Sequence, residues 1–100
     1  MKLHLREKAR DDLRQIRDRI AADNPDAAIR FEHEVERTLY DYIARHPEIG
    51  ARPNFKTRHK ALRYWPILRY HDYLVFYEPH EDHVDILRVL HGAQHLPPLL

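Results

Sequence analysis

Two arginines and a histidine in the C-terminal half are the side chains of this sequence best suited to catalysis. Arg63 and Arg88 carry fixed positive charges, and His91 carries an imidazole, the side chain most often used as a general acid or base. A ribonuclease that works without a metal must activate a 2′-hydroxyl, stabilise a pentacoordinate phosphate and protonate a leaving oxygen. If the protein cleaves RNA, we expect these three residues to form its catalytic site.

The same half of the chain contains residues suited to binding alone. Arg63 and Arg69 flank Trp65, and arginines beside aromatic rings are frequent in contacts with proteins and nucleic acids. Arg88 interrupts an apolar run, so it needs a carboxylate within the chain, an exposed rim or a partner molecule. A solvent-exposed strand edge would explain the presence of Arg63 and Arg69 beside Trp65 equally well. The predicted partner-binding surface consists of Arg63, Trp65, Arg69, Arg88, His91, Gln94, His95, Leu96, Leu99 and Leu100.

The histidines raise the question of a metal site. The chain has nine histidines and no cysteine, so thiolate ligands are excluded. His80 and His83 bracket two acidic residues, but they fall in an expected turn, where polar residues are common. His91 and His95 would share a face only if the segment between them were helical. We therefore expect no metal site and no cofactor.

Composition limits the class of protein. A chain of 100 residues, of which 43% are hydrophobic and 33% charged, suits one globular domain over residues 1–100. The formal net charge of +1 does not indicate a dedicated nucleic-acid-binding protein. The N-terminus has no apolar leader, and no apolar run reaches the length of about 18 residues that a membrane span needs. We therefore expect a cytoplasmic protein without membrane contacts.

Two amphipathic helices are predicted in the first half, after a short strand at residues 2–5. Over residues 7–23, apolar side chains recur at steps of three and four. Asn24 suits a helix N-cap and Pro25 a first helical position, so a second helix begins there and continues to His46, before Pro47. Its predicted apolar stripe is Ala28, Phe31, Val35, Leu39, Tyr42 and His46. Two such stripes joined by a tight break predict an antiparallel helical hairpin.

Three strands are predicted in the second half, over residues 61–66, 72–79 and 83–91. The fold class is therefore α+β, in the order β-α-α-β-β-β, with the hairpin packed on a small, mainly antiparallel sheet. Regular alternation would place Val84, Ile86, Arg88 and Leu90 on one face of the last strand, and Asp85, Leu87, Val89 and His91 on the other. Both faces are largely apolar, as they are in residues 73–77. Either strand propensity and curvature explain this, or another chain covers the second face.

Several segments, taken together and in order, resemble the RelE/ParE superfamily of bacterial type II toxins. They are "ARDDL" in the first helix, "DNPDAAIRFEHEVERTL" entering the second, "HPEIGARP" after it, and "YLVFYEP" with "VDILRVLHGAQHL" at the end. The resemblance covers nearly the whole chain and is closer to the ParE branch than to the RelE branch.

The resemblance implies an architecture and a partner. Members of the superfamily have a helical hairpin on an antiparallel sheet, in agreement with the periodicities above. They are encoded beside a small antitoxin whose C-terminal segment folds across the toxin, so a cognate antitoxin is the expected partner. Such a partner would cover the extra apolar surface. A leucine tail left uncovered is compatible with a toxin homodimer, and the antitoxin-bound form with a heterotetramer.

The two branches differ in activity. RelE-type relatives cleave mRNA on the ribosome, whereas ParE-type relatives poison DNA gyrase, which needs a gripping surface and no bond-cutting groups. In this superfamily the position after Gly-Ala is often arginine, but here it is Gln94, and no tyrosine follows Tyr77. The resemblance thus implies a gyrase-binding toxin neutralised by its antitoxin. An RNA endonuclease is the first alternative, and an inactive toxin fold that only binds partners is the second.

Overall fold

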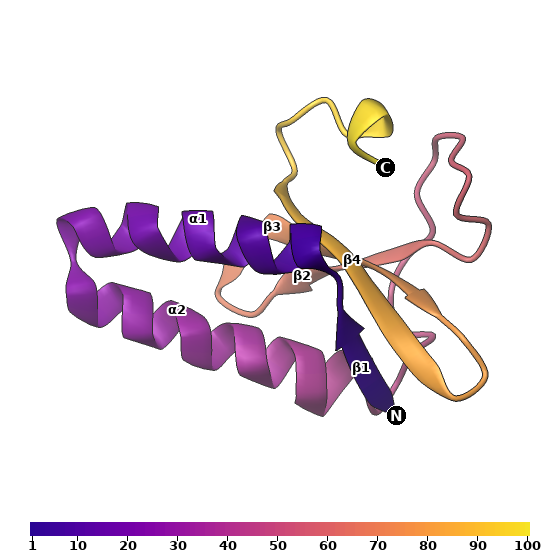
Figure 1. Cartoon of the computed structure of the whole chain (residues 1–100), viewed down its shortest axis with the longest axis horizontal. Coiled ribbons are helices and arrows are strands. Elements are labelled where there is room, and N and C mark those ends of the chain that lie inside the picture. The colour runs from indigo at the N-terminus through magenta and orange to yellow at the C-terminus, as the bar shows by residue number, and fades with distance from the viewer.

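The computed structural model describes all 100 residues as a helical hairpin on one four-stranded sheet (Figure 1). The strand β1 is followed by two helices, and three further strands complete the sheet in the order β1-β4-β3-β2. The predicted α+β class and element order are confirmed. The elements are β1 (Lys2–Leu5), α1 (Glu7–Asp23), α2 (Pro25–Arg37), η1 (Thr38–Ile43), β2 (Arg63–Ile67), β3 (Tyr70–Pro79), β4 (His83–His91) and η2 (Pro97–Leu99).

The break between α1 and α2 forms as its sequence predicts. The backbone N–H of Asn24 donates to the carbonyl of Ile20 at 2.9 Å and ends α1. The side chain of Asn24 then accepts a hydrogen bond from the N–H of Ala27 at 3.1 Å, and Pro25 occupies the first turn of α2. One residue therefore ends the first helix and caps the second. No helix of the protein combines the length and apolar character that crossing a bilayer requires.

The predicted stripe of the second helix is wrong in its last turns. From Thr38 the helix widens into the π-helical segment η1, and the N–H of Ala44 donates to the carbonyl of Leu39, five residues back. The extra residue rotates the buried face by one position. Ile43 and Ala44 are therefore buried, whereas Tyr42 is only half-buried and His46 is exposed.

The predicted alternation along β4 is also wrong beyond Ile86. Ile86 pairs with Tyr77, but the next pair along the antiparallel ladder is Arg88 with Phe76, so Leu87 is an extra residue in a β-bulge. The bulge brings Val89 to the same side as Ile86. The core beneath the helices therefore combines these two residues with side chains of α1, α2 and β3.

The chain itself covers the second apolar face of the sheet. Phe76 and Leu90 form a small second core there with Leu62. The connector before β2 contributes Phe55 to this cluster, and the C-terminal tail contributes its leucines 96 and 100. The two-faced apolar pattern of the strands therefore does not require a second chain to cover it.

Tyr77 fixes the start of the connector to the middle of the sheet. Its hydroxyl donates to the carbonyl of Pro47 at 2.7 Å and accepts from the N–H of Gly50 at 2.8 Å. Arg63 adds hydrogen bonds to the carbonyls of Gly50, at 2.7 Å, and Glu48, at 3.1 Å. Burial raises the pKa of Tyr77, and the hydrogen bond from Gly50 and the charge of Arg63 offset this only in part.

Candidate functional site

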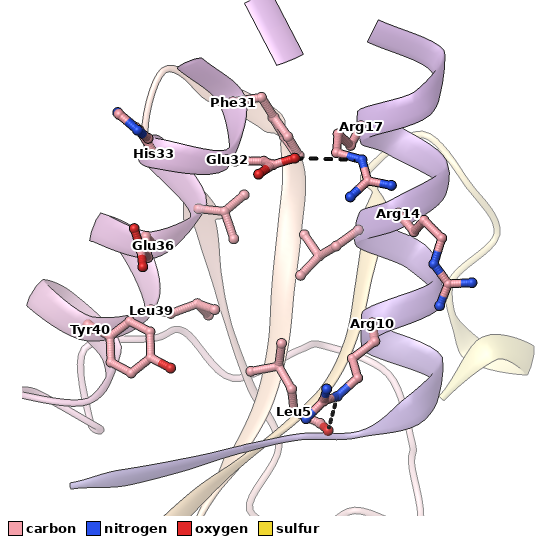
Figure 2. A pocket seen from close by; sticks show the side chains of 12 residues that line it. Leu5, Arg10, Arg14, Arg17, Phe31, Glu32, His33, Glu36, Leu39 and Tyr40 are labelled. Atoms are coloured by element: carbon pink, nitrogen blue, oxygen red, sulfur yellow. Dashed lines mark hydrogen bonds and ion pairs between the residues drawn. The ribbon is translucent and has the colours of Figure 1, made fainter. Parts of the chain in front are cut away.

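A groove of about 660 Å³ lies between α1 and α2, and the end of β1 crosses one end of it (Figure 2). The apolar stripes of the two helices meet the sheet at its base. The groove is lined there by Leu5, Leu13, Phe31, Val35 and Leu39. Phe31, Val35 and Leu39 are also members of the main core, so the base of the groove is rigid. Tyr40, with 54% of its surface exposed, stands at the rim.

The two rims of the groove carry opposite charges. Arg10, Arg14 and Arg17 follow one another at steps of four and three along α1, so they share one face of the helix. Glu32 and Glu36 are four residues apart on α2 and form the opposite rim. Arg17 Nε and Glu32 Oε1 approach to 3.6 Å across the groove, as Figure 2 shows. The site can therefore take a ligand with an apolar face flanked by acidic groups towards α1 and basic groups towards α2.

A second hollow, of about 800 Å³, lies between β4, the connector and the C-terminal tail. Five of its side chains are basic, and Glu78 and Asp85 are among the acidic groups that face them. Burial tends to raise the pKa of Asp85, but the hydrogen bond and charge of Arg6, then the charges of His83 and His80, hold that pKa below its usual value. The basic residues of this cleft are Arg6, Lys8, Lys56, Arg58 and Arg88.

Arg88 is held by α1. Its Nε and a terminal nitrogen donate to the two carboxylate oxygens of Asp12 at 2.8 and 2.9 Å. Asp12 also accepts the backbone N–H of Val89 at 2.9 Å, beyond the residues of β4 that pair with β1. The hydrogen bond with Asp12 raises the pKa of Arg88 despite its burial, and the charge of Asp12 adds to this. Arg88 could have been explained by a carboxylate within the chain, by an exposed rim or by a partner molecule. The structure shows the first of these, a carboxylate within the chain.

The other arginines of the predicted binding surface also have contacts within the chain. Arg63 bonds the carbonyls of residues 48 and 50, as described above. Arg69 lies in the turn between β2 and β3 with a positive φ of 68°, and its Nε is 2.8 Å from the carboxylate of the buried Glu34. Trp65 packs against the core on the helix side of the sheet.

Most of the predicted residues from Arg88 onwards line two shallow depressions. Arg88, His91 and Gln94 line one of about 340 Å³ beside α1. His91 makes local contacts: its Nδ1 accepts the N–H of Ala93 at 3.0 Å, and its own N–H donates to the side chain of Gln94 at 2.8 Å. Gln94, His95 and Leu96 line the other depression, of about 360 Å³, between tail and connector. Leu96 and Leu100 pack on the second core, whereas Leu99 is 36% exposed.

The three residues considered for RNA cleavage do not converge. Arg63 pairs with Tyr77 and His91 with Tyr73, so the two lie four residues apart along β3, or about 13 Å in the strand direction. They also belong to strands on opposite sides of β3. Only Arg88 and His91 share a depression.

Comparison with known proteins assigns the fold to a family. A family model described as "ParE toxin of type II toxin-antitoxin system, parDE" matches residues 3–96. The chain belongs to the ParE toxin family. Among solved structures, one titled "Chromosomal ParDE TA system from P. aeruginosa" matches with a TM-score of 0.72 at 18% identity, covering 91% of this chain and 95% of that chain. At that identity the likeness shows the fold alone. A search of curated proteins found no match.

The ParE match includes both rims of the hairpin groove and ends at Leu96, before the last four residues. The resemblance seen in the sequence is thereby confirmed, and the protein is a type II toxin by family. The groove residues are absent from the surface predicted from the sequence, because their apolar stripes were assigned entirely to the core. The spacing of the α1 arginines was the available signal, since it aligns three cations beside an apolar stripe.

Proposed function

We propose that this ParE-family protein inhibits DNA gyrase by binding it, and that a cognate antitoxin neutralises the protein by placing an amphipathic helix in the hairpin groove. The observation that carries the second part is the groove itself, with an apolar base between a basic rim on α1 and an acidic rim on α2. An amphipathic helix that binds in such a groove packs its apolar face against the apolar base. The charged groups on the two rims would fix the orientation of the bound helix.

The geometry favours binding over RNA cleavage as the toxic activity. The chemistry of cleavage needs an acid or base beside fixed cations, all within hydrogen-bond reach of one phosphate. Arg63 and His91 lie in different parts of the sheet, and Arg88 already has a bidentate partner in Asp12. The hydroxyl of Tyr77, inside the sheet, is used by two backbone groups of the connector. A toxin that acts by binding gyrase does not need any of these groups to be available for catalysis.

One observation supports the alternative of a ribonuclease. The cleft containing Lys56 and Arg58 collects cations on one side of the molecule, and His59 adds a titratable group. Such a surface could follow an RNA backbone. The same cations would also suit the DNA bound by gyrase, so the cleft agrees with both activities.

An inactive binding module would keep the groove and show neither activity. A toxin homodimer and a toxin–antitoxin heterotetramer both stay predictions, which light scattering can distinguish.

A charge reversal in the groove tests the proposed neutralisation. Arg14→Glu combined with Arg17→Glu should leave growth inhibition intact, because both side chains are exposed and surface ion pairs contribute about 0–1 kcal/mol each. The double variant should no longer be rescued when the protein encoded beside the toxin is co-expressed. Its affinity for that protein should fall about tenfold or more, because like charges then face each other.

The matched control carries the same change of charge outside the groove. Arg30→Glu combined with Arg45→Glu alters two exposed arginines that do not line it, and this variant should be rescued like the natural chain. Equal rescue and equal affinity for both double variants would place the antitoxin elsewhere. Growth inhibition lost in the groove variant alone would instead make the α1 arginines part of the toxic surface.

A further inference from the structure

A cluster of two imidazoles and a carboxylate lies at the edge of the sheet formed by β1 and β4. His83 and Asp85 are two residues apart on β4, so their side chains leave the strand on the same side. The parallel register places His4 of β1 beside Asp85. Val84 and Ile86, between and after them, enter the core under the helices, so the cluster is on the opposite face. No short motif reveals this cluster, because its histidines come from opposite ends of the chain.

The ligand atoms of the cluster are spaced almost as a tetrahedral metal ion requires. Asp85 Oδ1 lies 3.7 Å from His4 Nδ1 and 3.5 Å from His83 Nε2. The three residues can each offer one ligand atom such that the three atoms lie within 4.8 Å of one another. In a tetrahedral zinc site with bonds of about 2.0–2.1 Å, ligand atoms are roughly 3.3–3.4 Å apart. Small side-chain adjustments would therefore complete the geometry.

The carboxylate oxygen at the centre of the cluster lacks a hydrogen bond. The Asp85 side chain is only 7% exposed, and its Oδ2 accepts from Arg6 at 2.9 Å and lies 3.1 Å from His80 Nε2. Its Oδ1 is buried and has no hydrogen-bond partner. Such an orphaned oxygen is unfavourable, because it has lost water and gained no donor. A cation between Oδ1 and the two imidazoles would satisfy it.

Asp82 orients one of the imidazoles for binding. His83 Nδ1 lies 2.7 Å from Asp82 Oδ1. An ionised carboxylate can only accept a hydrogen bond, so Nδ1 carries a hydrogen, and the neutral form of the ring, which is the form that binds a metal, has its lone pair on Nε2. That lone pair belongs to the nitrogen nearest Asp85 Oδ1. A carboxylate behind a histidine is the usual outer support of a metal-binding imidazole.

The geometry points to a binding site for a divalent transition-metal ion, with zinc the best fit, formed by His4 Nδ1, His83 Nε2 and Asp85 Oδ1. Two nitrogens and one carboxylate suit zinc and its neighbours in the first transition row, whereas magnesium and calcium prefer oxygen ligands. Water, or His80, whose ring stacks on His83 with centroids 4.7 Å apart, would take the fourth position. The guanidinium of Arg6 repels the ion and limits its affinity.

A bound ion would join β1 to β4. Their ladder has only four residue pairs, and β1 leads directly into α1, which forms one rim of the hairpin groove. Metal binding would therefore stabilise the attachment of the N-terminal strand and raise the melting temperature. This proposal concerns a different surface from the groove and does not depend on the identity of the toxin's target.

The test is a titration of the untagged protein with Zn²⁺ by calorimetry, and with Co²⁺ by visible absorption, which reports tetrahedral coordination. We expect one saturable equivalent. His4→Gln and His83→Gln should each weaken binding about tenfold or more, and Asp82→Asn should weaken it about 10–100-fold through loss of orientation. Arg6→Gln should strengthen binding, because it removes the nearest positive charge.

His71→Gln is the control, because His71 is exposed and lies outside the cluster. Its binding should equal that of the natural chain. Circular dichroism shows whether each variant is folded, and a misfolded His83→Gln leaves His4→Gln, at an exposed position, as the decisive comparison. Binding that does not saturate near one equivalent, or that is unchanged in folded His4→Gln, would overturn the proposal.

Discussion

The contact between Asp12 and Arg88 decides whether this arginine is structural. Asp12→Ala removes the carboxylate that accepts two hydrogen bonds from Arg88, at 2.8 and 2.9 Å, and one from the N–H of Val89, at 2.9 Å. These bonds attach α1 to β4 next to the bulge. Their loss would leave a mostly buried guanidinium without a carboxylate, with a hydrogen bond to the carbonyl of Leu99 at 3.3 Å remaining. We therefore expect a large decrease in the free energy of unfolding.

The expected magnitude follows from the burial of the pair. Removing one partner of a fully buried ion pair costs about 3–5 kcal/mol. Here the side chains keep 12% and 17% of their exposure, so water can partly replace the carboxylate, and about 2–4 kcal/mol is expected. For a domain of this size, each kcal/mol lowers the melting temperature by about 4–8 °C. The variant should therefore melt roughly 8–32 °C lower. The loss of about 2–4 kcal/mol is a large part of a typical free energy of unfolding of about 5–15 kcal/mol.

Urea denaturation and thermal melting measure this change, and the neighbouring aspartate supplies the control. Asp11 forms an exposed ion pair with Arg14 on the same helix, so Asp11→Ala should cost about 0.5 kcal/mol or less. Adding Arg88→Met to Asp12→Ala should recover part of the loss, because the double variant no longer buries an unpaired charge. An Asp12→Ala protein as stable as Asp11→Ala would refute the structural role of the pair.

Three further predictions concern the connector and the C-terminal corner. A Cβ at position 50 would lie 2.5 Å from the hydroxyl of Tyr77 and 2.9 Å from the carbonyl of Tyr64, so Gly50→Ala should cost about 1–3 kcal/mol in urea denaturation. Gly92→Ala, with its nearest contact at 3.5 Å, should be almost neutral; equal losses at both positions would contradict the packing argument. The raised pKa of Tyr77 stabilises the fold below the usual pKa of about 10, and this contribution is lost as pH rises through the higher folded value. Stability measured from pH 9 to 11 should accordingly fall less in Tyr77→Phe than in the natural chain. His91→Ala should keep its growth inhibition, because the side chain of His91 only accepts a local hydrogen bond from Ala93 and packs on the ring of Tyr73; loss of toxicity in a folded variant would support the ribonuclease.

The helical hairpin and the order of helices and strands along the chain could be predicted because local signals determine them. Asn24 and Pro25 mark the end of one helix and the start of the next. The apolar residues of α1 before them recur every three or four positions, as an amphipathic helix requires. The predicted periodicity failed at two places where one extra residue is inserted into a helix or strand. The π-helical turn at Thr38 and the bulge at Leu87 each shift the periodicity by one residue, and the sequence shows only which side chains are apolar.

The candidate site was less predictable, because its parts meet only after folding. The partner of Arg88 is Asp12, from the first helix, and the partner of Arg69 is Glu34, from the second. A sequence shows the charges but not these pairings. The sequence also leaves open what covers the apolar tail, since the second core formed by Phe76 is assembled from three distant segments.

The most direct test of the account is a supercoiling and DNA-cleavage assay with purified gyrase. It needs the toxin alone, the toxin with the protein encoded beside it, and the groove variant that combines Arg14→Glu with Arg17→Glu. We predict that the toxin inhibits supercoiling and accumulates cleaved DNA, that the neighbouring protein suppresses this effect, and that the groove variant resists suppression. Unaffected gyrase across a wide range of toxin concentration, with mRNA cleaved in a parallel reaction containing translating ribosomes, would contradict the account.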